Sequence, residues 1–327
     1  MDVGLTIPTR GPLATPDAIT SIVRRAEELG FAHLSLSDHV VVPRRISSPY
    51  PYSATGAWPG AAAGDCLEQF TLLAYLSAIS SRPRLITAVA VIPYRAAVHT
   101  AKIAATIDVL SKGRVVVGVG AGWMKEEFEA VGAPPFEERG RVTDEYLQAF
   151  KLLWTEDEPR VSGRHVQLAN IVFQPKPVQK PHPPIWVGGE SPAAVRRTVR
   201  YGDAWFPIGN NPRHPLDTVA RFTEGVRRLH RLAEEHGRDP KSIGLAFYAN
   251  WFDETKTVSV DTGERHLLTG GPAHIAEDID ALGALGVRDL VLTLQRDTLE
   301  RTFASMQHFA EEIRPLTKGG IDRSERA

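Results

Sequence analysis

Short apolar runs alternate with longer amphipathic segments along the whole chain. The short runs are rich in Val, Ile, Leu and Ala and are typical of buried strands, whereas the longer segments repeat apolar residues at helical spacing. We predict strands at residues 3–8, 31–37, 85–92, 114–119, 185–189, 203–207, 243–248 and 289–294. We predict helices at residues 16–29, 68–80, 103–110, 136–154, 216–236, 272–285 and 299–316, and another that opens at Ser191-Pro192.

This alternation predicts an α/β fold with parallel strands and right-handed crossovers. Eight such units are the number that closes a (β/α)8 TIM barrel, and a doubly wound open sheet is the competing fold. We expect one domain over residues 1–316, with insertions at about 43–64 and 155–184, followed by a polar tail at 317–327.

Composition narrows the function classes. The chain has 327 residues and a net charge of −1, so nothing favours nucleic acid or a membrane surface as a partner. A single cysteine, Cys66, excludes an internal disulfide and a cysteine-rich metal site. Met1-Asp2 runs directly into an apolar strand, and no apolar segment has the roughly 20 residues that span a bilayer. We therefore expect a soluble cytoplasmic protein.

The strand at 114–119 ends in a glycine-rich loop. Gly118, Gly120 and Gly122 leave the backbone N–H groups open to close approach by a ligand, although a tight strand-to-helix turn explains the same glycines. The third glycine comes too early for the G-x-G-x-x-G dinucleotide motif, so a nicotinamide site is not predicted.

In a barrel, ligands lie at the carboxyl ends of the strands, and chemistry-bearing residues follow several of them. Asp38-His39 follow the second strand, where a histidine can exchange protons and a carboxylate can orient it. The alternative is a loop-capping aspartate and a packed histidine. Gly188-Gly189 before Ser191 form a potential phosphate site, although Ser191 also suits a plain helix cap. Asn210 and Arg213 add an amide and a cation, or simply a solvated loop.

Several of these motifs together resemble the luciferase-like monooxygenase family of flavin and deazaflavin enzymes, and in particular its coenzyme F420-dependent oxidoreductase branch. The likeness extends from residue 1 to about 313. The resembling segments are 37–43 (SDHVVVP), 118–123 (GVGAGW), 126–128 (EEF), 138–141 (ERGR), 175–177 (PKP), 181–189 (PHPPIWVGG) and 202–205 (GDAW).

The resemblance implies a barrel with a redox cofactor across the strand ends, and usually a homodimer. It makes His39 the expected proton donor or acceptor and places Val89-Ala90 where relatives often have a non-proline cis peptide behind the ring. The cofactor contacts expected from the residues and the resemblance together are Asp38, Val89, Ala90, Gly120, Ala121, Gly122, Gly188, Gly189, Ser191, Asn210 and Arg213.

One position departs from part of the family. Sugar-phosphate dehydrogenases of this family have an acidic glutamate directly after the glycine loop, where this chain has Trp123. This argues against sugar-phosphate oxidation and predicts an apolar wall over the ring. Tyr50, Tyr52 and Trp58 of the long loop, with Trp123, are the expected substrate pocket. Glu126 and Glu127 lie on the following helix, where they either reach inward or form a solvated helix face, and the solvated face is the preferred interpretation.

The predicted function is an F420-dependent oxidoreductase that transfers a hydride between the cofactor and a small organic substrate. The alternatives are an FMN-dependent monooxygenase that uses O₂ and a separate reductase, and a non-catalytic ligand-binding barrel. We expect no metal, because no H-E-x-x-H or similar cluster is present, and His33, His99 and His165 are interpreted as structural. A metal-dependent hydrolase therefore lacks a sequence signal.

Overall fold

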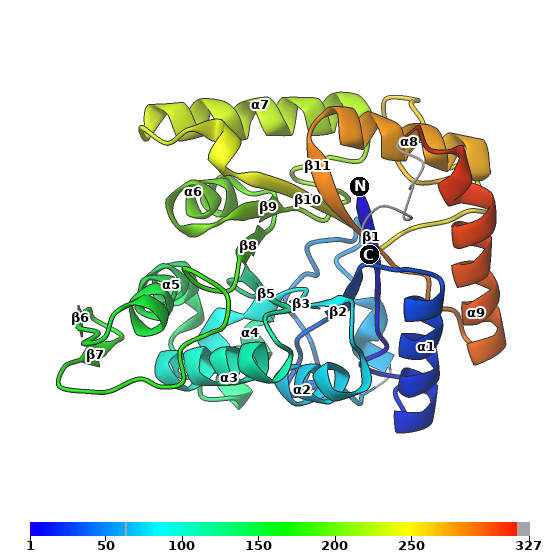
Figure 1. Cartoon of the computed structure of the whole chain (residues 1–327). Helices are drawn as coiled ribbons and strands as arrows, with labels where there is room; N and C mark the ends of the chain where they lie inside the picture. The colour runs from blue at the N-terminus through cyan, green and yellow to red at the C-terminus, as the bar shows by residue number, and fades with distance from the viewer. Residues whose placement is uncertain (63, 319–327) are drawn as a thin grey trace.

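The strands form one closed parallel barrel surrounded by helices (Figure 1). The computed structural model describes residues 1–62 and 64–318. The order of neighbours is β3-β2-β1-β11-β10-β9-β8-β5-β4, and β3 also pairs with β5. Because β4 continues the line of β3, eight strand positions close the barrel, so the predicted fold is confirmed and the open sheet is wrong. The strands are β1 (Asp2–Thr6), β2 (His33–Leu36), β3 (Arg84–Thr87), β4 (Ala90–Val91), β5 (Val115–Gly120), β8 (Ile185–Gly188), β9 (Ala204–Phe206), β10 (Gly244–Ala249) and β11 (Val287–Leu292).

The third predicted strand, residues 85–92, is interrupted by a bulge. β3 pairs with β5 as far as Ile86–Val116, and β4 resumes the pairing at Ala90–Val119. Three residues, 87–89, therefore lie opposite two, 117–118. The cis peptide is Ala88–Val89. The sequence placed it at Val89–Ala90, and this position is wrong by one residue because Ala90 already belongs to the extended pairing of β4.

Helices follow the strands as predicted, and side-chain caps mark several of their first turns. Thr15, Ser191, Thr218 and Thr298 each accept a hydrogen bond from the backbone N–H three residues later. The helices are α1 (Pro16–Glu28), α2 (Gln69–Ile79), α3 (Ala97–Leu110), α4 (Lys125–Ala130), α5 (Arg139–Thr155), α6 (Pro192–Tyr201), α7 (Val219–Glu235), α8 (Pro272–Ala284) and α9 (Leu299–His308).

The closing helix does not continue unchanged to residue 316. α9 ends at His308, a π-helical turn covers Phe309–Ile313, and a 3₁₀ turn covers Arg314–Leu316. Pro315 has no backbone N–H, which favours a change of hydrogen-bond pattern here. Phe309 and Ile313 are both buried, so the wider turn keeps two apolar side chains on the inner face. Of the predicted tail, residues 319–327 lie outside the described part of the chain.

The two largest apolar cores lie on the two sides of the barrel wall. The larger one lies between the strands and the helices and includes the fully buried Leu147, Trp154 and Phe222. The smaller one fills the barrel interior. Its buried members are Ile86, Ala88, Val116, Trp186, Ala204, Phe206, Ala246 and Val291. A filled interior means that a ligand must enter at an end of the barrel rather than its middle.

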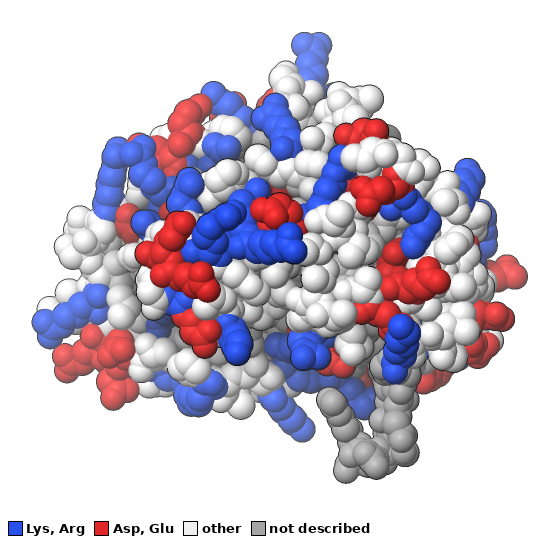
Figure 2. Space-filling view, turned by 90° about the horizontal axis from the view of Figure 1, so that it is seen from above, with Lys and Arg blue, Asp and Glu red and all other residues white. Residues whose placement is uncertain are grey.

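The predicted insertions are irregular segments. Residues 155–184 carry the expected small hairpin, with β6 (Val161–Ser162) antiparallel to β7 (Gln167–Leu168). The loop over 43–64 carries only a 3₁₀ turn, Pro59–Ala62. None of the described helices is long and apolar enough to cross a membrane. α7 has the charged outer face expected from sequence, and Figure 2 shows acidic and basic side chains interspersed over this side of the molecule.

Candidate functional site

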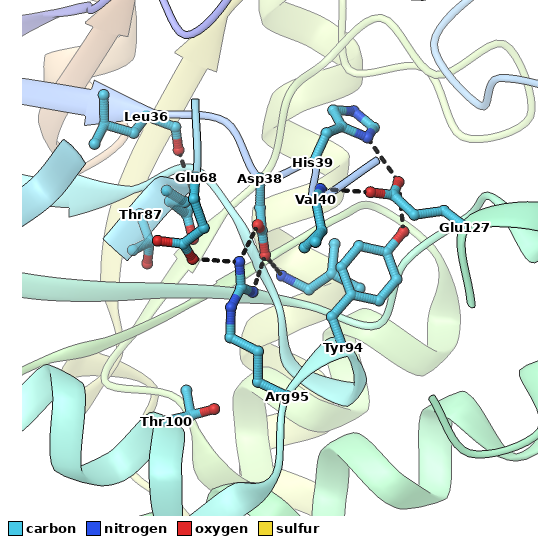
Figure 3. Close-up of polar contacts among 12 residues, drawn as sticks. Leu36, Asp38, His39, Val40, Glu68, Thr87, Tyr94, Arg95, Thr100 and Glu127 are labelled. Carbon is cyan, nitrogen blue, oxygen red and sulfur yellow. Dashed lines mark hydrogen bonds and ion pairs between the residues drawn. The ribbon is translucent and has the colours of Figure 1, made fainter. Parts of the chain in front are cut away.

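Asp38 joins the bulged strand to β2 at the carboxyl end of the barrel. Its two carboxylate oxygens accept hydrogen bonds of 2.8 and 2.9 Å from the Arg95 guanidinium, and Oδ2 also accepts one of 2.9 Å from the Val91 N–H. Arg95 reaches Glu68 at 2.7 Å as well (Figure 3). The buried Asp38 therefore fixes the backbone of β4 at Val91. The cofactor contact predicted for Asp38 stays a prediction.

His39 is held by a carboxylate from a distant element. Its Nδ1 lies 2.8 Å from Oε2 of Glu127, and the Tyr94 hydroxyl donates to the same oxygen at 2.9 Å. The other oxygen of Glu127 accepts the N–H groups of Val40 and Val41 at 2.6 and 3.2 Å. Figure 3 shows the second ring nitrogen of His39 pointing away from Glu127. Because a carboxylate can only accept, Nδ1 carries the proton and Nε2 is left for chemistry.

The preferred interpretation of Glu127 as a solvated side chain is wrong, and the alternative, that it reaches inward, holds. Glu127 is fully buried. Burial alone would raise the pKa of its carboxyl, but the hydrogen bonds from His39, Val40 and Tyr94 outweigh it, and the pKa lies below its usual value. The same contact, with burial, keeps the pKa of Tyr94 well above its usual value. Glu127 is thus ionised and Tyr94 neutral at physiological pH.

The short helix α4 attaches the loop after β2 through two consecutive glutamates of its first turn. Glu127 binds the backbone at residues 40–41, and Glu126 accepts the N–H groups of Ser47 and Ser48 at 2.6 and 3.1 Å. The Ser48 hydroxyl in turn accepts the Lys125 N–H at 3.0 Å. The glycine loop after β5 therefore leads to a helix that fixes the segment following His39.

The four aromatic residues predicted to line the substrate pocket lie together beside His39. The Trp58 ring centroid is 4.4 Å from that of His39, Trp123 is 5.9 Å from Trp58, and Tyr50 is 5.2 Å from Trp123 and 5.6 Å from Tyr52. Burial raises the pKa of Tyr50 to about 12 and that of Tyr52 well above its usual value. Both phenols are therefore neutral, and the expected apolar wall is assembled; its role in binding substrate stays a prediction.

The glycines at the ends of β5 and β8 make room for the bulge. A Cβ on Gly120 would lie 2.6 Å from a Val89 methyl group, and one on Gly188 would lie 2.9 Å from the other. A Cβ on Gly122 would meet Phe128 at 2.6 Å. The space beside these glycines is therefore filled by the chain itself, which supports the tight-turn alternative over close approach by a ligand. Cofactor contacts from Gly120, Ala121, Gly122, Gly188 and from Val89 and Ala90 stay predictions.

At the predicted phosphate site, Gly188 to Ser191, the protein itself occupies some of the polar groups. Gly189 has a φ of +100°, a conformation that favours glycine, and the Ser191 hydroxyl accepts the Ala194 N–H at 3.2 Å as a helix cap. Arg213 is exposed. The Asn210 Oδ1 is buried without a hydrogen-bond partner in the described chain. Of these residues, only Asn210 has a buried polar atom whose hydrogen bond a ligand could supply.

Glu190 was not recognised in the sequence, yet it occupies the centre of this site. It is buried, and its carboxylate accepts the N–H groups of Ile208 and Gly209 at 2.6 and 3.3 Å and the Asn211 amide at 3.3 Å. Burial raises the pKa of Glu190 to about 7, although the hydrogen bonds from Ile208 and Asn211 oppose the rise. Glu190 thus ties the loop after β9 to the end of β8.

The opposite end of the barrel holds an acidic group around a histidine. Ligand atoms of Asp2, His33 and Asp289 lie within 4.8 Å of one another. His33 Nε2 is 2.9 Å from Asp289, and Arg84 is 3.8 Å from the same oxygen. Arg84 supplies a positive charge beside Asp289, and the structural interpretation of His33 stays a prediction.

The comparisons with known proteins identify the family of this chain. The family model described as luciferase-like monooxygenase matches residues 1–252. The chain belongs to the luciferase-like monooxygenase family. As a luciferase-like protein it is an enzyme of the oxidoreductase class. An FMNH(2)-dependent dimethylsulfone monooxygenase of Pseudomonas putida is 31% identical over 313 residues, which cover 83% of this chain and 82% of the relative.

Solved structures support the fold of this luciferase-like chain. The monooxygenase RslO1 from Streptomyces bottropensis superposes with a TM-score of 0.73 at 22% identity, covering 96% of this chain and 99% of that one. The coenzyme F420 dependent tetrahydromethanopterin reductase from Methanopyrus kandleri gives 0.71 at 16% identity, covering 97% and 100%. At these identities the likeness establishes the barrel, and the cofactor is left to other observations.

The contacts between several site residues of this luciferase-like enzyme were not predicted, for one reason. Glu127 is 88 residues from His39 and Arg95 is 57 from Asp38, so no local pattern joins the partners. Glu190 lies between Gly188-Gly189 and the helix cap Ser191, and only these neighbours were predicted as site residues. The only available signal was an acidic pair in the first turn of a helix, which is also typical of ordinary solvated helices.

Proposed function

We propose that this enzyme holds a deazaflavin or flavin ring across the carboxyl ends of its strands and moves a hydride between that ring and a small organic substrate. The observation that carries the proposal is a set of buried polar atoms without partners in the described chain. Thr6 Oγ1 ends β1, Asn210 Oδ1 follows β9 and Asn250 Oδ1 follows β10. A buried polar atom costs roughly 1–3 kcal/mol when it is left unpaired. Three such atoms at one end of a barrel fit a polar ring that supplies donors.

His39 is the proposed proton donor or acceptor. Glu127 holds its Nδ1, so that the opposite nitrogen can exchange a proton with substrate. Trp58 and Trp123 pack beside the imidazole, which is buried. A bound cofactor of this class supplies the hydride-accepting carbon or nitrogen, while the chain binds, orients and shields it.

The anionic tail of the cofactor is assigned to the corner formed by Gly188, Gly189, Ser191, Asn210 and Arg213. The amino terminus of α6 lies there and favours a negative charge. Glu190 is compatible with this assignment only when it is protonated, and its raised pKa allows that form near neutral pH. Tail binding is therefore expected to weaken as the pH rises above about 7.

Two cofactors fit this scheme. The sequence resemblance favours coenzyme F420, and the name of the Pseudomonas putida relative favours reduced FMN with O₂ and a separate reductase. Family membership supports an enzyme over the non-catalytic barrel. A homodimer stays a prediction, which sedimentation equilibrium would check.

Spectral titration of the protein with F420 and with FMN, each oxidised and reduced, tests the proposal. We expect one of them to bind at least about tenfold more tightly than the other. His39→Gln should then lower turnover about 100-fold and leave the dissociation constant of that cofactor unchanged. Failure of both cofactors to bind would contradict the proposal.

A further inference from the structure

Arg10 follows β1 and lies against the aromatic wall of the site. Its guanidinium carbon is 4.9 Å from the centroid of the Trp58 ring, and the same ring contacts His39. Gly60 backs both residues, because a Cβ there would lie 2.9 Å from the Arg10 guanidinium carbon and 2.4 Å from the indole. Arg10 is therefore held in position by packing, close to the proposed proton donor.

Apart from the Trp58 ring, this cation has no partner in the described chain. Within residues 1–62 and 64–318, Arg10 makes no hydrogen bond or ion pair, and its Nη1 is a buried atom without a partner. The buried carboxylates around the barrel mouth have other partners: Asp38 binds Arg95, Glu127 binds His39, and Glu190 accepts hydrogen bonds from Ile208 and Asn211. A half-buried charge without a counter-charge is unfavourable, so this site favours an anion brought from outside.

The anion is distinct from the cofactor tail. β1 and β8 are four steps apart in the strand order β1-β11-β10-β9-β8, which places them on opposite sides of an eight-stranded barrel. The tail is assigned to the end of β8, and Arg10 follows β1. Arg10 instead acts on Tyr50 of the predicted substrate wall and on Tyr248 of β10: burial raises the pKa values of both phenols, and the positive charge of Arg10 opposes the rise.

We propose that Arg10 binds the anionic end of the substrate, and that the substrate is a small organic carboxylate or sulfonate whose apolar part lies against Trp58 and Tyr50. The fork of a guanidinium matches two oxygens of either group. This inference rests on the proposed function, because it assigns the substrate class of the same site. It also explains why a cation stands among aromatic side chains with no carboxylate beside it.

Binding of matched probe pairs to the cofactor-loaded enzyme tests the inference. Calorimetry would compare hexanoate with hexanamide, and hexanesulfonate with hexanesulfonamide, so that the two pairs separate the two kinds of anion. We expect at least one anion to bind at least tenfold more tightly than its neutral partner, a factor typical of a charged hydrogen bond. Equal binding within both pairs, or no binding of either anion, overturns the inference.

Variants assign the preference to one side chain. Arg10→Gln should abolish the difference between anion and amide, and Arg10→Lys should keep part of it because the charge remains. Arg45→Gln removes an exposed arginine of the neighbouring loop and should change nothing. Circular dichroism confirms that each variant is folded, and Arg10→Lys keeps the test open if Arg10→Gln is not. An unchanged preference in Arg10→Gln overturns the inference.

The cofactor titration separates this inference from the proposed function. If the wild type binds neither F420 nor FMN, the proposed function fails, and the probe pairs are measured on the protein alone. If Arg10→Gln loses affinity for the cofactor but keeps the anion preference, Arg10 serves the ring and the inference fails by itself. Unchanged cofactor binding with a lost anion preference supports both.

Discussion

Glu127 shows how one buried carboxylate can organise a site. It accepts hydrogen bonds from His39, Tyr94 and the N–H groups of Val40 and Val41. Four donors compensate for the loss of water around the charge, which is why a carboxylate with no exposed surface keeps a low pKa. The consequence is a single orientation and a single tautomer for the His39 ring.

Glu127→Gln should therefore release His39 without removing it. The amide can donate as well as accept, so the ring no longer has one preferred tautomer. We expect kcat to fall about 10- to 100-fold with little change in cofactor affinity. Nitrogen-15 shifts of His39, which report the tautomer, and the pH profile of kcat provide the measurement. Glu126→Gln is the matched control, since Glu126 binds only Ser47 and Ser48 in the described chain; an equal loss there would contradict the assignment.

Glu190 makes the stability of the protein depend on pH. Its pKa is about 7 in the folded state against an ordinary value of 4.5, so between these values the folded state binds the proton more tightly than the unfolded chain. The free energy of unfolding should therefore fall as the pH rises from about 4.5 to about 7 and then level off, by roughly 3 kcal/mol in all.

Glu190→Gln tests this dependence. The amide oxygen can still accept the Ile208 N–H but does not titrate, so the fall assigned to Glu190 should disappear from urea unfolding curves between about pH 5 and 8. Glu158→Gln serves as the control, because that side chain is 83% exposed. The same pH slope in Glu190→Gln and the wild type would show that another group causes it.

The element that shapes the mouth is the bulge between β3 and β4. It places Val89 among Gly120 of β5 and Gly188 of β8, and both glycines lack the Cβ that would collide with it. One irregular residue in one strand thus determines the residue type in two others. The glycines after β5, which the sequence suggested as a ligand-binding loop, make room for Val89 and Phe128.

Gly120→Ala should destabilise the barrel by about 1–3 kcal/mol, because the new methyl group overlaps Val89 at 2.6 Å. Val89→Ala removes the colliding methyl group, so the double variant should recover at least about 1 kcal/mol relative to the sum of the single changes. Urea unfolding of the wild type, the two single variants and the double variant gives the coupling free energy between the two positions. Cofactor affinity of the double variant then shows whether Gly120 also contacts the ring: recovered stability with lost affinity would assign it that second role.

At the scale of the whole molecule, barrel closure joins the two ends of the chain. β1 pairs in parallel with β11 over Asp2–Asp289 to Leu5–Leu292, so the amino-terminal strand is held by the last one. Neither half of the sheet is complete without the other. This topology supports the predicted single domain over residues 1–316.

We expect one cooperative unfolding transition. Urea titrations followed by tryptophan fluorescence and by far-ultraviolet circular dichroism should give the same midpoint and slope. The tryptophans Trp58, Trp154 and Trp205 are all buried. They lie in the loop over residues 43–64, in α5 and in β9, so fluorescence samples distant parts of the barrel. Two separated transitions would contradict the single domain.

The sequence by itself determined the alternation of strands and helices, the barrel that follows from eight such units, and the end of the barrel at which Asp38 and His39 lie. These features depend on local periodicity and on chain order, which a sequence displays directly. It also determined the aromatic wall, because an apolar cluster needs only the right residue types near the mouth.

Only the tertiary structure decided the partners of the charged groups. Glu127, for which a solvated helix face was preferred, is buried beside His39, and Val89 fills the space beside Gly120 and Gly188. Arg10 had no predicted role, and in the described part of the chain its buried Nη1 has no hydrogen-bond partner. A hydrogen bond depends on distances of about 3 Å between residues far apart in the chain, and closure of the barrel, rather than any local pattern, sets those distances.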